Sequence, residues 1–143
     1  MVGRILDQGS DVIKYPTWSP TSDKIVFTNL RFHLRVLDIP TKEITEIDTI
    51  PGSYISADKP AWSKDGKFIY FIEGKQLCFV DIEGKKKVTV FETEEYIAEY
   101  RISPNGQKIL VLLNEEGPYA WGKAIYLVNA DGSCIKTLVD LGV

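Results

Sequence analysis

The chain contains one histidine, His33, so at most one imidazole could act as a general base or a metal ligand. A serine nucleophile would need such a base, and no Gly-x-Ser-x-Gly elbow occurs. No cluster of Cys, His and Asp has zinc-site spacing. Residues 129–132, Asn-Ala-Asp-Gly, resemble part of a calcium loop but lack its alternating acidic ligands and closing Glu, which indicates a tight turn. We therefore expect a non-enzymatic chain without metal or cofactor, with His33 as a surface or packing residue.

Serines and tryptophans recur at fixed places. Ser19, Ser63 and Ser103 occupy one position of a repeated motif, and Trp18 and Trp62 come directly before the first two of these serines. A nucleophile is needed once, so we interpret the recurring serine as a structural hydroxyl at a strand end. We interpret both tryptophans as core residues, with a stacking platform for bases or sugars as the alternative.

These residues belong to a threefold internal repeat. Residues 14–27 align with residues 58–71 and with residues 99–111. Trp18 and Trp62 are 44 residues apart, and Ile102 follows Trp62 by 40 residues. A period of this length indicates an array of supersecondary units.

Each copy contains four short segments rich in Val, Ile, Phe, Tyr and Leu and bounded by Gly, Pro, Asp or Asn, which predicts strands. No segment has helical periodicity, so the predicted fold class is all-β. The predicted strands cover residues 14–18, 24–29, 34–39 and 43–48; then 59–63, 67–73, 76–82 and 86–92; then 98–103, 108–114, 124–130 and 134–140.

The second strands are apolar on nearly every residue, as in residues 69–72 and 110–113, so both of their faces must be covered. Face-to-face stacking of four-stranded antiparallel sheets, the blades of a β-propeller, would achieve this. Asp65-Gly66 and Asn105-Gly106 predict tight turns, since both tolerate positive φ. Ser22-Asp23 occupies the same place without glycine, which predicts a different turn type.

The predicted organisation is one β-propeller unit over residues 1–143. It has three complete repeats, at 14–48 (blade 1), 59–92 (blade 2) and 98–140 (blade 3). Residues 4–9 resemble the last strand and form an extra outer strand at the N-terminus. Propellers typically have four to eight blades, so three blades should not close a ring. The chain is either part of a longer propeller or pairs as a homodimer into a ring of about six blades, in which 4–9 and 134–140 would compete for one edge.

The motifs at residues 18–27, 62–71 and 102–111 resemble the TolB-type propeller repeat, whose hallmark is Trp-Ser-Pro-Asp-Gly followed by an apolar strand. Departures are Lys64 for Pro, Thr21-Ser22-Asp23 around the first turn, and Ile102 for Trp. The resemblance covers essentially the whole chain and implies the propeller fold. The same repeat occurs in periplasmic TolB-like proteins and in the propeller domains of prolyl oligopeptidase and dipeptidyl peptidase relatives.

The non-repeating loops are the candidate partner-binding site, because scaffolds usually carry function in loops. Aromatic and acidic groups gather there, as at a partner-binding rim. The candidates are Arg31, His33, Tyr54, Glu94, Glu95, Tyr96, Glu115, Glu116, Tyr119 and Trp121. Tyr119 and Trp121 could instead cover the edge of a blade. The acidic residues, together with Glu99, predict a basic or polar protein partner.

Net charge and hydropathy restrict the other partners. The formal net charge of −3 and the absence of a long basic run argue against nucleic acid. No stretch is long and apolar enough to predict membrane insertion. The two cysteines, Cys78 and Cys134, lie in apolar segments and predict buried free thiols. Residues 1–7 do not resemble a signal peptide, because Asp7 interrupts any apolar core. The resemblance to TolB-like proteins implies an extracytoplasmic location. A cytoplasmic location stays open as the alternative.

The favoured function is therefore a non-enzymatic scaffold that binds a protein through its loop face. The alternatives are the gating propeller of a peptidase related to prolyl oligopeptidase, or a small-molecule or sugar binder. The last would use polar residues on the inner strands, namely Lys14, Lys59, Glu99 and Arg101.

Overall fold

The computed structural model describes residues 12–29, 33–47, 58–83, 86–114, 122–133 and 135–141. These residues form strands and turns, and no helix occurs among them. The all-β prediction is therefore confirmed. Within the same ranges, no helix has the length and apolar character needed to span a membrane. The predicted extra strand at 4–9 lies outside the described residues.

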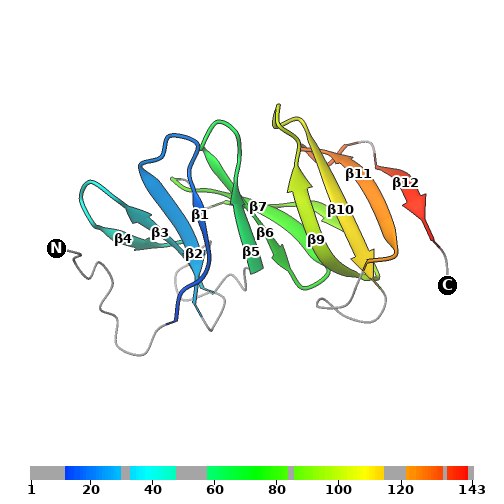
Figure 1. Cartoon of the computed structure of the whole chain (residues 1–143), viewed down its shortest axis with the longest axis horizontal. Helices are drawn as coiled ribbons and strands as arrows, with labels where there is room; N and C mark the ends of the chain where they lie inside the picture. Colours follow the sequence, from blue (N-terminus) through cyan, green and yellow to red (C-terminus); the bar gives the residue numbers. More distant parts are fainter. Residues whose placement is uncertain are drawn as a thin grey trace.

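Three antiparallel sheets of four strands follow one another along the chain (Figure 1). Each sheet has the order of its strands in the sequence, as expected for propeller blades. Blade 1 contains β1 (Lys14–Trp18), β2 (Lys24–Thr28), β3 (Leu34–Asp38) and β4 (Ile44–Glu46). Blade 2 contains β5 (Asp58–Trp62), β6 (Phe68–Glu73), β7 (Gln76–Asp81) and β8 (Lys87–Glu92), and blade 3 contains β9 (Tyr96–Ile102), β10 (Lys108–Asn114), β11 (Ala124–Asn129) and β12 (Lys136–Asp140).

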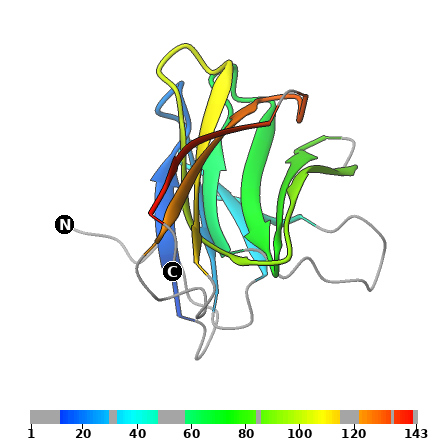
Figure 2. The same cartoon turned by 90° about the vertical axis from the view of Figure 1, so that its right-hand side faces the viewer.

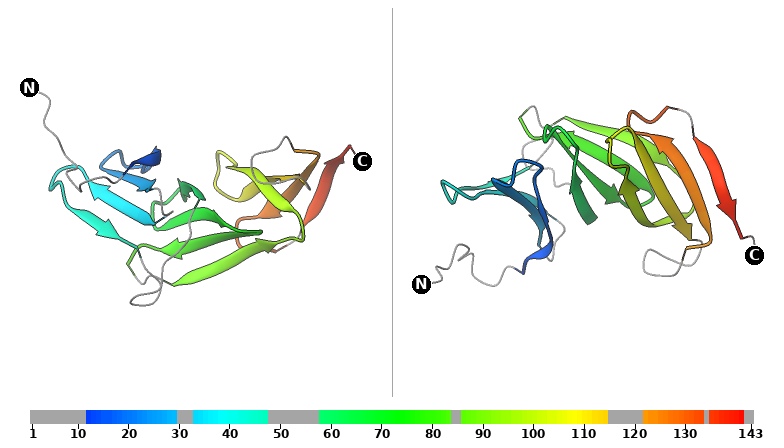
Figure 3. Two further views of the ribbon diagram at one scale, coloured as in Figure 1. Left: turned by 90° about the horizontal axis from the view of Figure 1, so that it is seen from below. Right: turned by 45° about the horizontal axis from the view of Figure 1, so that its top comes forward.

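The blades stack face to face. Viewed along the direction in which the blades follow one another, the three sheets overlap one behind another (Figure 2). Seen from below, they fan out from the inner strands β1, β5 and β9 (Figure 3, left). The result is an open arc, with blades 1 and 3 at its two ends.

Two apolar clusters fill the spaces between the blades. The first joins blades 1 and 2 around Trp62 and Phe71, and the second joins blades 2 and 3 around Tyr70 and Tyr100. Cys78 belongs to the first cluster as a buried free thiol, as predicted, and burial raises the pKa of that thiol. Cys134 lies outside the described residues.

The prediction that both tryptophans are core residues is wrong for one of them. The side chain of Trp62 is 7% exposed, and its indole Nε1 donates a hydrogen bond to the carbonyl oxygen of Thr17 in blade 1 at 3.1 Å. Trp18 occupies the same repeat position but is 61% exposed. The difference arises because Trp62 packs against a preceding blade, and blade 1 has none among the described residues.

The turn between the first and second strands has one geometry in all three blades. Gly66 and Gly106 both have φ +76°, and Ser22 has φ +61° at the equivalent position. In each blade, the amide of this residue donates to the carbonyl oxygen of the motif serine three residues earlier. The expectation of a different turn type at Ser22 is therefore wrong. The same backbone hydrogen bonds hold the serine in the left-handed region that glycine normally occupies.

Candidate functional site

A groove runs across the inner strands on the concave side of the arc. Its volume is about 400 Å³, and all three blades contribute to it. The lining residues are Tyr15, Pro16 and Thr17 from β1, Lys59, Pro60 and Ala61 from β5, and Glu99, Tyr100 and Arg101 from β9. The groove therefore depends on the stacking of the blades, because no single blade supplies its walls.

Backbone irregularities shape this groove. Tyr15 and Lys59 have φ values of +54° and +48° at equivalent repeat positions, which non-glycine residues rarely adopt. In both blades, the pairing of the first and second strands shifts at this point. Such β-bulges redirect side chains at the edge of a sheet, here those facing the groove.

Most polar groups of the groove are used in contacts between blades. The ammonium group of Lys59 donates to the carbonyl oxygen of Ala98. The hydroxyl of Thr17 donates to the carbonyl oxygen of Pro60 at 3.3 Å. The hydroxyl of Tyr100 lies 2.5 Å from the carbonyl oxygen of Lys59 and 3.0 Å from that of Tyr70. These contacts hold the inner strands together.

Burial raises the pKa of the Tyr100 hydroxyl well above its ordinary value. The hydroxyl therefore remains protonated and serves as a structural donor. Arg101 pairs with the carboxylate of Glu99 and donates to the carbonyl oxygen of Tyr100 at 3.2 Å. Each of these polar groups has a structural partner within the chain.

The rim of the groove is accessible. The side chain of Arg101 is 74% exposed, and Tyr15 is 36% exposed. A second hollow of about 380 Å³ continues along the inner strands past Trp62 and Pro104. A third, of about 630 Å³, lies between the turns of blades 2 and 3 near Asp65 and Asp131.

The repeated serines are structural, as predicted. The hydroxyl of Ser63 accepts from the amide of Phe68 at 3.0 Å and donates to Oδ1 of Asp65 at 2.7 Å. Ser103 makes the same two bonds, with Asn105 in place of the aspartate. The serine therefore closes the first turn of the blade and is engaged in that role.

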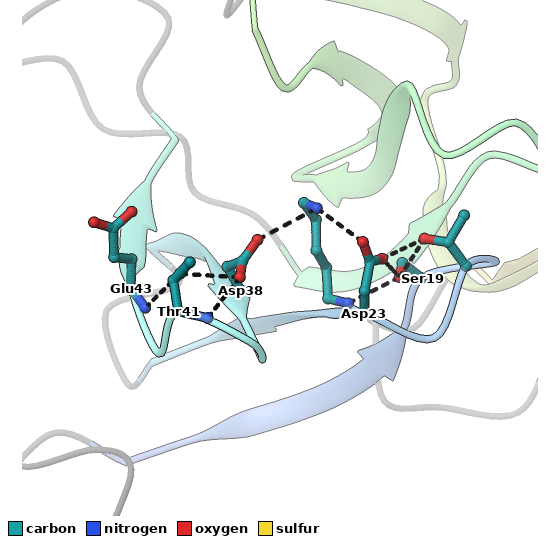
Figure 4. A network of polar contacts seen from close by, with 7 residues as sticks. Ser19, Asp23, Asp38, Thr41 and Glu43 are labelled. Atoms are coloured by element: carbon teal, nitrogen blue, oxygen red, sulfur yellow. Dashed lines mark hydrogen bonds and ion pairs between the residues drawn. The ribbon is translucent and has the colours of Figure 1, made fainter.

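Blade 1 extends this serine contact into a polar network (Figure 4). Asp23 accepts from the hydroxyls of Ser19 and Thr21, and the ammonium group of Lys24 bridges Asp23 and Asp38 at 3.2 and 3.5 Å. The Thr21 hydroxyl and the Lys24 ammonium lower the pKa of Asp23. The network ties the first turn of the blade to the turn that begins at Asp38.

The turn carboxylates predict a specific dependence on pH. The hydrogen bonds from the Ser63 hydroxyl and the Lys67 amide lower the pKa of Asp65 below its ordinary value of 3.8. A lowered pKa stabilises the folded state above that ordinary value, and the contribution disappears as the pH falls through the folded-state pKa. The Asp65→Asn variant should therefore be less stable than wild type at neutral pH, and this difference should shrink in acid.

Urea unfolding of wild type and Asp65→Asn from pH 7 to about pH 2 would measure this difference. The variant should fold, because Asn105 already accepts both hydrogen bonds in blade 3. A stability difference that does not change with pH would contradict the assigned role of the Asp65 charge.

His33 closes a loop in blade 1. Its side chain is 11% exposed, and Nδ1 lies 3.1 Å from the carboxylate of Glu46, which also pairs with Arg35 at 3.6 Å. The amide of His33 donates to the side chain of Asn29 at 3.0 Å. These contacts agree with a packing role for the histidine.

Two other predicted loop residues, Glu94 and Glu95, lie between blades 2 and 3, whereas Tyr96 is not in a loop but is the first residue of β9. Glu94 is exposed, and the amide of Glu95 donates to the hydroxyl of Thr93 at 3.2 Å. The ammonium group of Lys75 lies 4.8 Å from the centroid of the Tyr96 ring. The remaining predicted site residues, Arg31, Tyr54, Glu115, Glu116, Tyr119 and Trp121, lie outside the described residues.

The structure also identifies groove residues that the loop prediction omitted. The sequence predicts Lys59 and Arg101 as ligand contacts only for a small-molecule binder and Glu99 also as part of the acidic surface, and it does not single out Tyr15, Pro16 or Pro60. Their common signal is position, since all lie on the first strand of a blade. Within the described ranges, no group of three or more His, Cys, Asp or Glu side chains is arranged to hold a metal ion.

The comparisons with known proteins concern the fold. No family model and no curated protein matches the sequence. A TolB-like protein from Agrobacterium tumefaciens superposes with a TM-score of 0.74 at 19% identity, covering 95% of this chain and 51% of that chain. The chain therefore has a TolB-like β-propeller fold.

Two further structures support the same architecture. An oligogalacturonate lyase in complex with manganese gives a TM-score of 0.73 at 16% identity, covering 93% of this chain and 42% of that chain. A chain of a nidogen–laminin complex gives a TM-score of 0.69 at 14% identity, and the match covers 95% of this chain and 51% of that chain. At these identities the likeness is one of fold, and this chain spans about half the length of these three chains.

Proposed function

We propose that this propeller module is a non-enzymatic scaffold that binds a protein segment on its inner-strand groove and the adjoining loops. The observation that carries this proposal is the accessible rim of the groove, where Tyr15 and Arg101 line the same groove as the apolar residues Pro16 and Pro60. Tyrosine and arginine are among the residue types that contribute most to binding energy in protein interfaces.

The chemistry of the groove supports binding more than catalysis. A general acid or base must be able to reach and exchange a proton with a substrate. The Lys59 ammonium and the Tyr100 hydroxyl are instead used to join blades 2 and 3. The groups left accessible on the rim are suited to packing and hydrogen bonding.

We propose a basic or polar segment as the partner. Glu94 is exposed two residues before β9, the strand that carries Glu99 and Arg101 into the groove. An exposed carboxylate attracts positively charged groups and speeds their association, and salt weakens this effect. A small polar molecule is the second candidate, since a volume of about 400 Å³ is within the range of ligand pockets.

A peptide library displayed on phage and selected on the purified chain would test the proposed function. The selected peptides should be enriched in Lys, Arg or polar residues. Tyr15→Ala should weaken their binding by at least about tenfold, as loss of an aromatic anchor usually does. Failure to select any peptide, or binding that Tyr15→Ala leaves unchanged, would contradict the groove as the site.

A charge reversal tests the polarity of the partner separately. Glu94→Lys should weaken the binding of the selected peptides at low salt and have a smaller effect on it at high salt. The matched control is Glu83→Lys, which makes the same change at an exposed position in the turn between β7 and β8. Equal effects of both substitutions would indicate a response to net charge alone.

A further inference from the structure

We propose that the two end faces of the arc bind each other between two copies of this chain, closing a ring of six blades. The leading face of a blade is defined as the face that packs on the preceding blade, and the trailing face as the one that packs on the following blade. In blade 2, Trp62 and Ile69 belong to the leading face, and Tyr70 belongs to the trailing face. This proposal does not depend on what binds in the groove.

The leading face of blade 1 has the residues of such an interface, but at the inner strand no described part of the chain covers it. Trp18 is 61% exposed, whereas its equivalent Trp62 is 7% exposed. Ile25 is half-buried, whereas its equivalents Ile69 and Ile109 are fully buried. Phe27, further along this face, is already buried, so the open part is centred on Trp18.

The trailing face of blade 3 shows the complementary pattern. Leu110 is 42% exposed, whereas its equivalents Val26 and Tyr70 are 0% and 5% exposed beneath a following blade. The strand register places more apolar side chains on the same face as Leu110. They are Leu112, Ile125, Leu127 and Val139.

A second copy is the occupant that satisfies both faces together. The two interfaces within the chain each join a trailing face to the next leading face, and pairing blade 3 with blade 1 of another copy continues this series. Two arcs of three blades make six, within the usual range for propellers. The two-fold arrangement closes, so neither face is left open.

The repeat also predicts one specific contact. The indole Nε1 of Trp62 donates to the carbonyl oxygen of Thr17, the residue before Trp18. Arg101 is equivalent to Thr17, because it directly precedes Ile102 at the tryptophan position of blade 3. We therefore expect Trp18 to donate to the carbonyl oxygen of Arg101 in the second copy.

Light scattering on a sizing column would measure the mass of the full chain. We expect twice the chain mass of 16.1 kDa for wild type. Trp18→Asp and Leu110→Asp should each reduce the mass to that of one chain, since each places a charge in both interfaces of the ring. Thr89→Asp, at an exposed position of the middle blade, should leave the dimer intact. Circular dichroism would verify that each variant keeps its β-sheet, and Trp18→Ser and Leu110→Ser would replace any variant that unfolds.

Mixing the two variants distinguishes this ring from other dimers. A 1:1 mixture of Trp18→Asp and Leu110→Asp retains one unmodified interface, between Trp18 of one copy and Leu110 of the other. Dimers should therefore reappear in the mixture, with weaker association than wild type. Three results would overturn the proposal: a wild-type monomer at every concentration, which would assign the faces to blades of another polypeptide; a mass that grows beyond two chains; or a mixture that stays monomeric.

Discussion

Replacing Trp62 by alanine is expected to lower the free energy of unfolding by about 3–5 kcal/mol, the usual cost of truncating a buried tryptophan. Its ring fills the cluster between blades 1 and 2, and its indole donates to the carbonyl oxygen of Thr17. The alanine variant would lose that contact and leave a cavity at the joint between the two blades. Urea unfolding would measure the loss from the shift in the transition midpoint.

The internal repeat supplies a matched control for this substitution. Trp18→Ala makes the same chemical change at the same repeat position, but Trp18 is 61% exposed. Both substitutions are best compared in the Leu110→Asp background, where association between copies should not contribute. We expect Trp18→Ala to change stability there by no more than about 0.5 kcal/mol. Equal losses for the two variants would contradict the assignment of Trp62 to the joint and of Trp18 to an open face.

Gly132→Ala is expected to lower the free energy of unfolding by about 2–4 kcal/mol, more than the position of Gly132 in a surface turn suggests. Gly132 has φ +89°, where L-residues are strained by about 1–2 kcal/mol. A Cβ atom at this position would also lie 2.7 Å from the carbonyl oxygen of Val90 in β8. Because that atom is backbone, the alanine could fit only if the turn of blade 3 moved away from blade 2.

Gly74→Ala separates these two effects. Gly74 has φ +61°, and a Cβ atom there would meet nothing within 4 Å. This variant should therefore show only the backbone strain of about 1–2 kcal/mol. Thermal or urea unfolding of both variants gives the comparison. If Gly132→Ala were no more costly than Gly74→Ala, the close approach of the blade 3 turn to β8 would be disproved.

The local structure of this protein was predictable from short segments. Strand formation follows from β-branched and aromatic residues over four to seven positions, and the motif turn from Ser63 and Asp65, whose hydrogen bonds span at most five residues. The strands of the structure accordingly begin and end within two residues of the predicted positions. The repeat also identified the blade, because a sheet that is apolar on both faces requires neighbouring sheets.

The turn at Ser22 shows where this local reasoning failed. Its residues lack the glycine that favours positive φ, yet the backbone takes the same path as at Gly66. The hydrogen bonds of Ser19 and the network around Asp23 and Lys24 hold it there. Contacts on both sides of a turn can outweigh a local conformational preference of about 1–2 kcal/mol.

The candidate site depended on tertiary structure. Tyr15, Lys59 and Arg101 are far apart in the sequence and meet only because their blades stack. In the same way, identical tryptophans became a core residue and an exposed one, and Gly132 became restricted by Val90 of another blade. The hydrogen bonds of a blade lie in its turns and between strands that follow one another in the sequence, so each blade could be predicted from a short stretch of residues. Burial and grooves depend on residues from different blades, so the open surfaces became known only once the stacking of the blades was known.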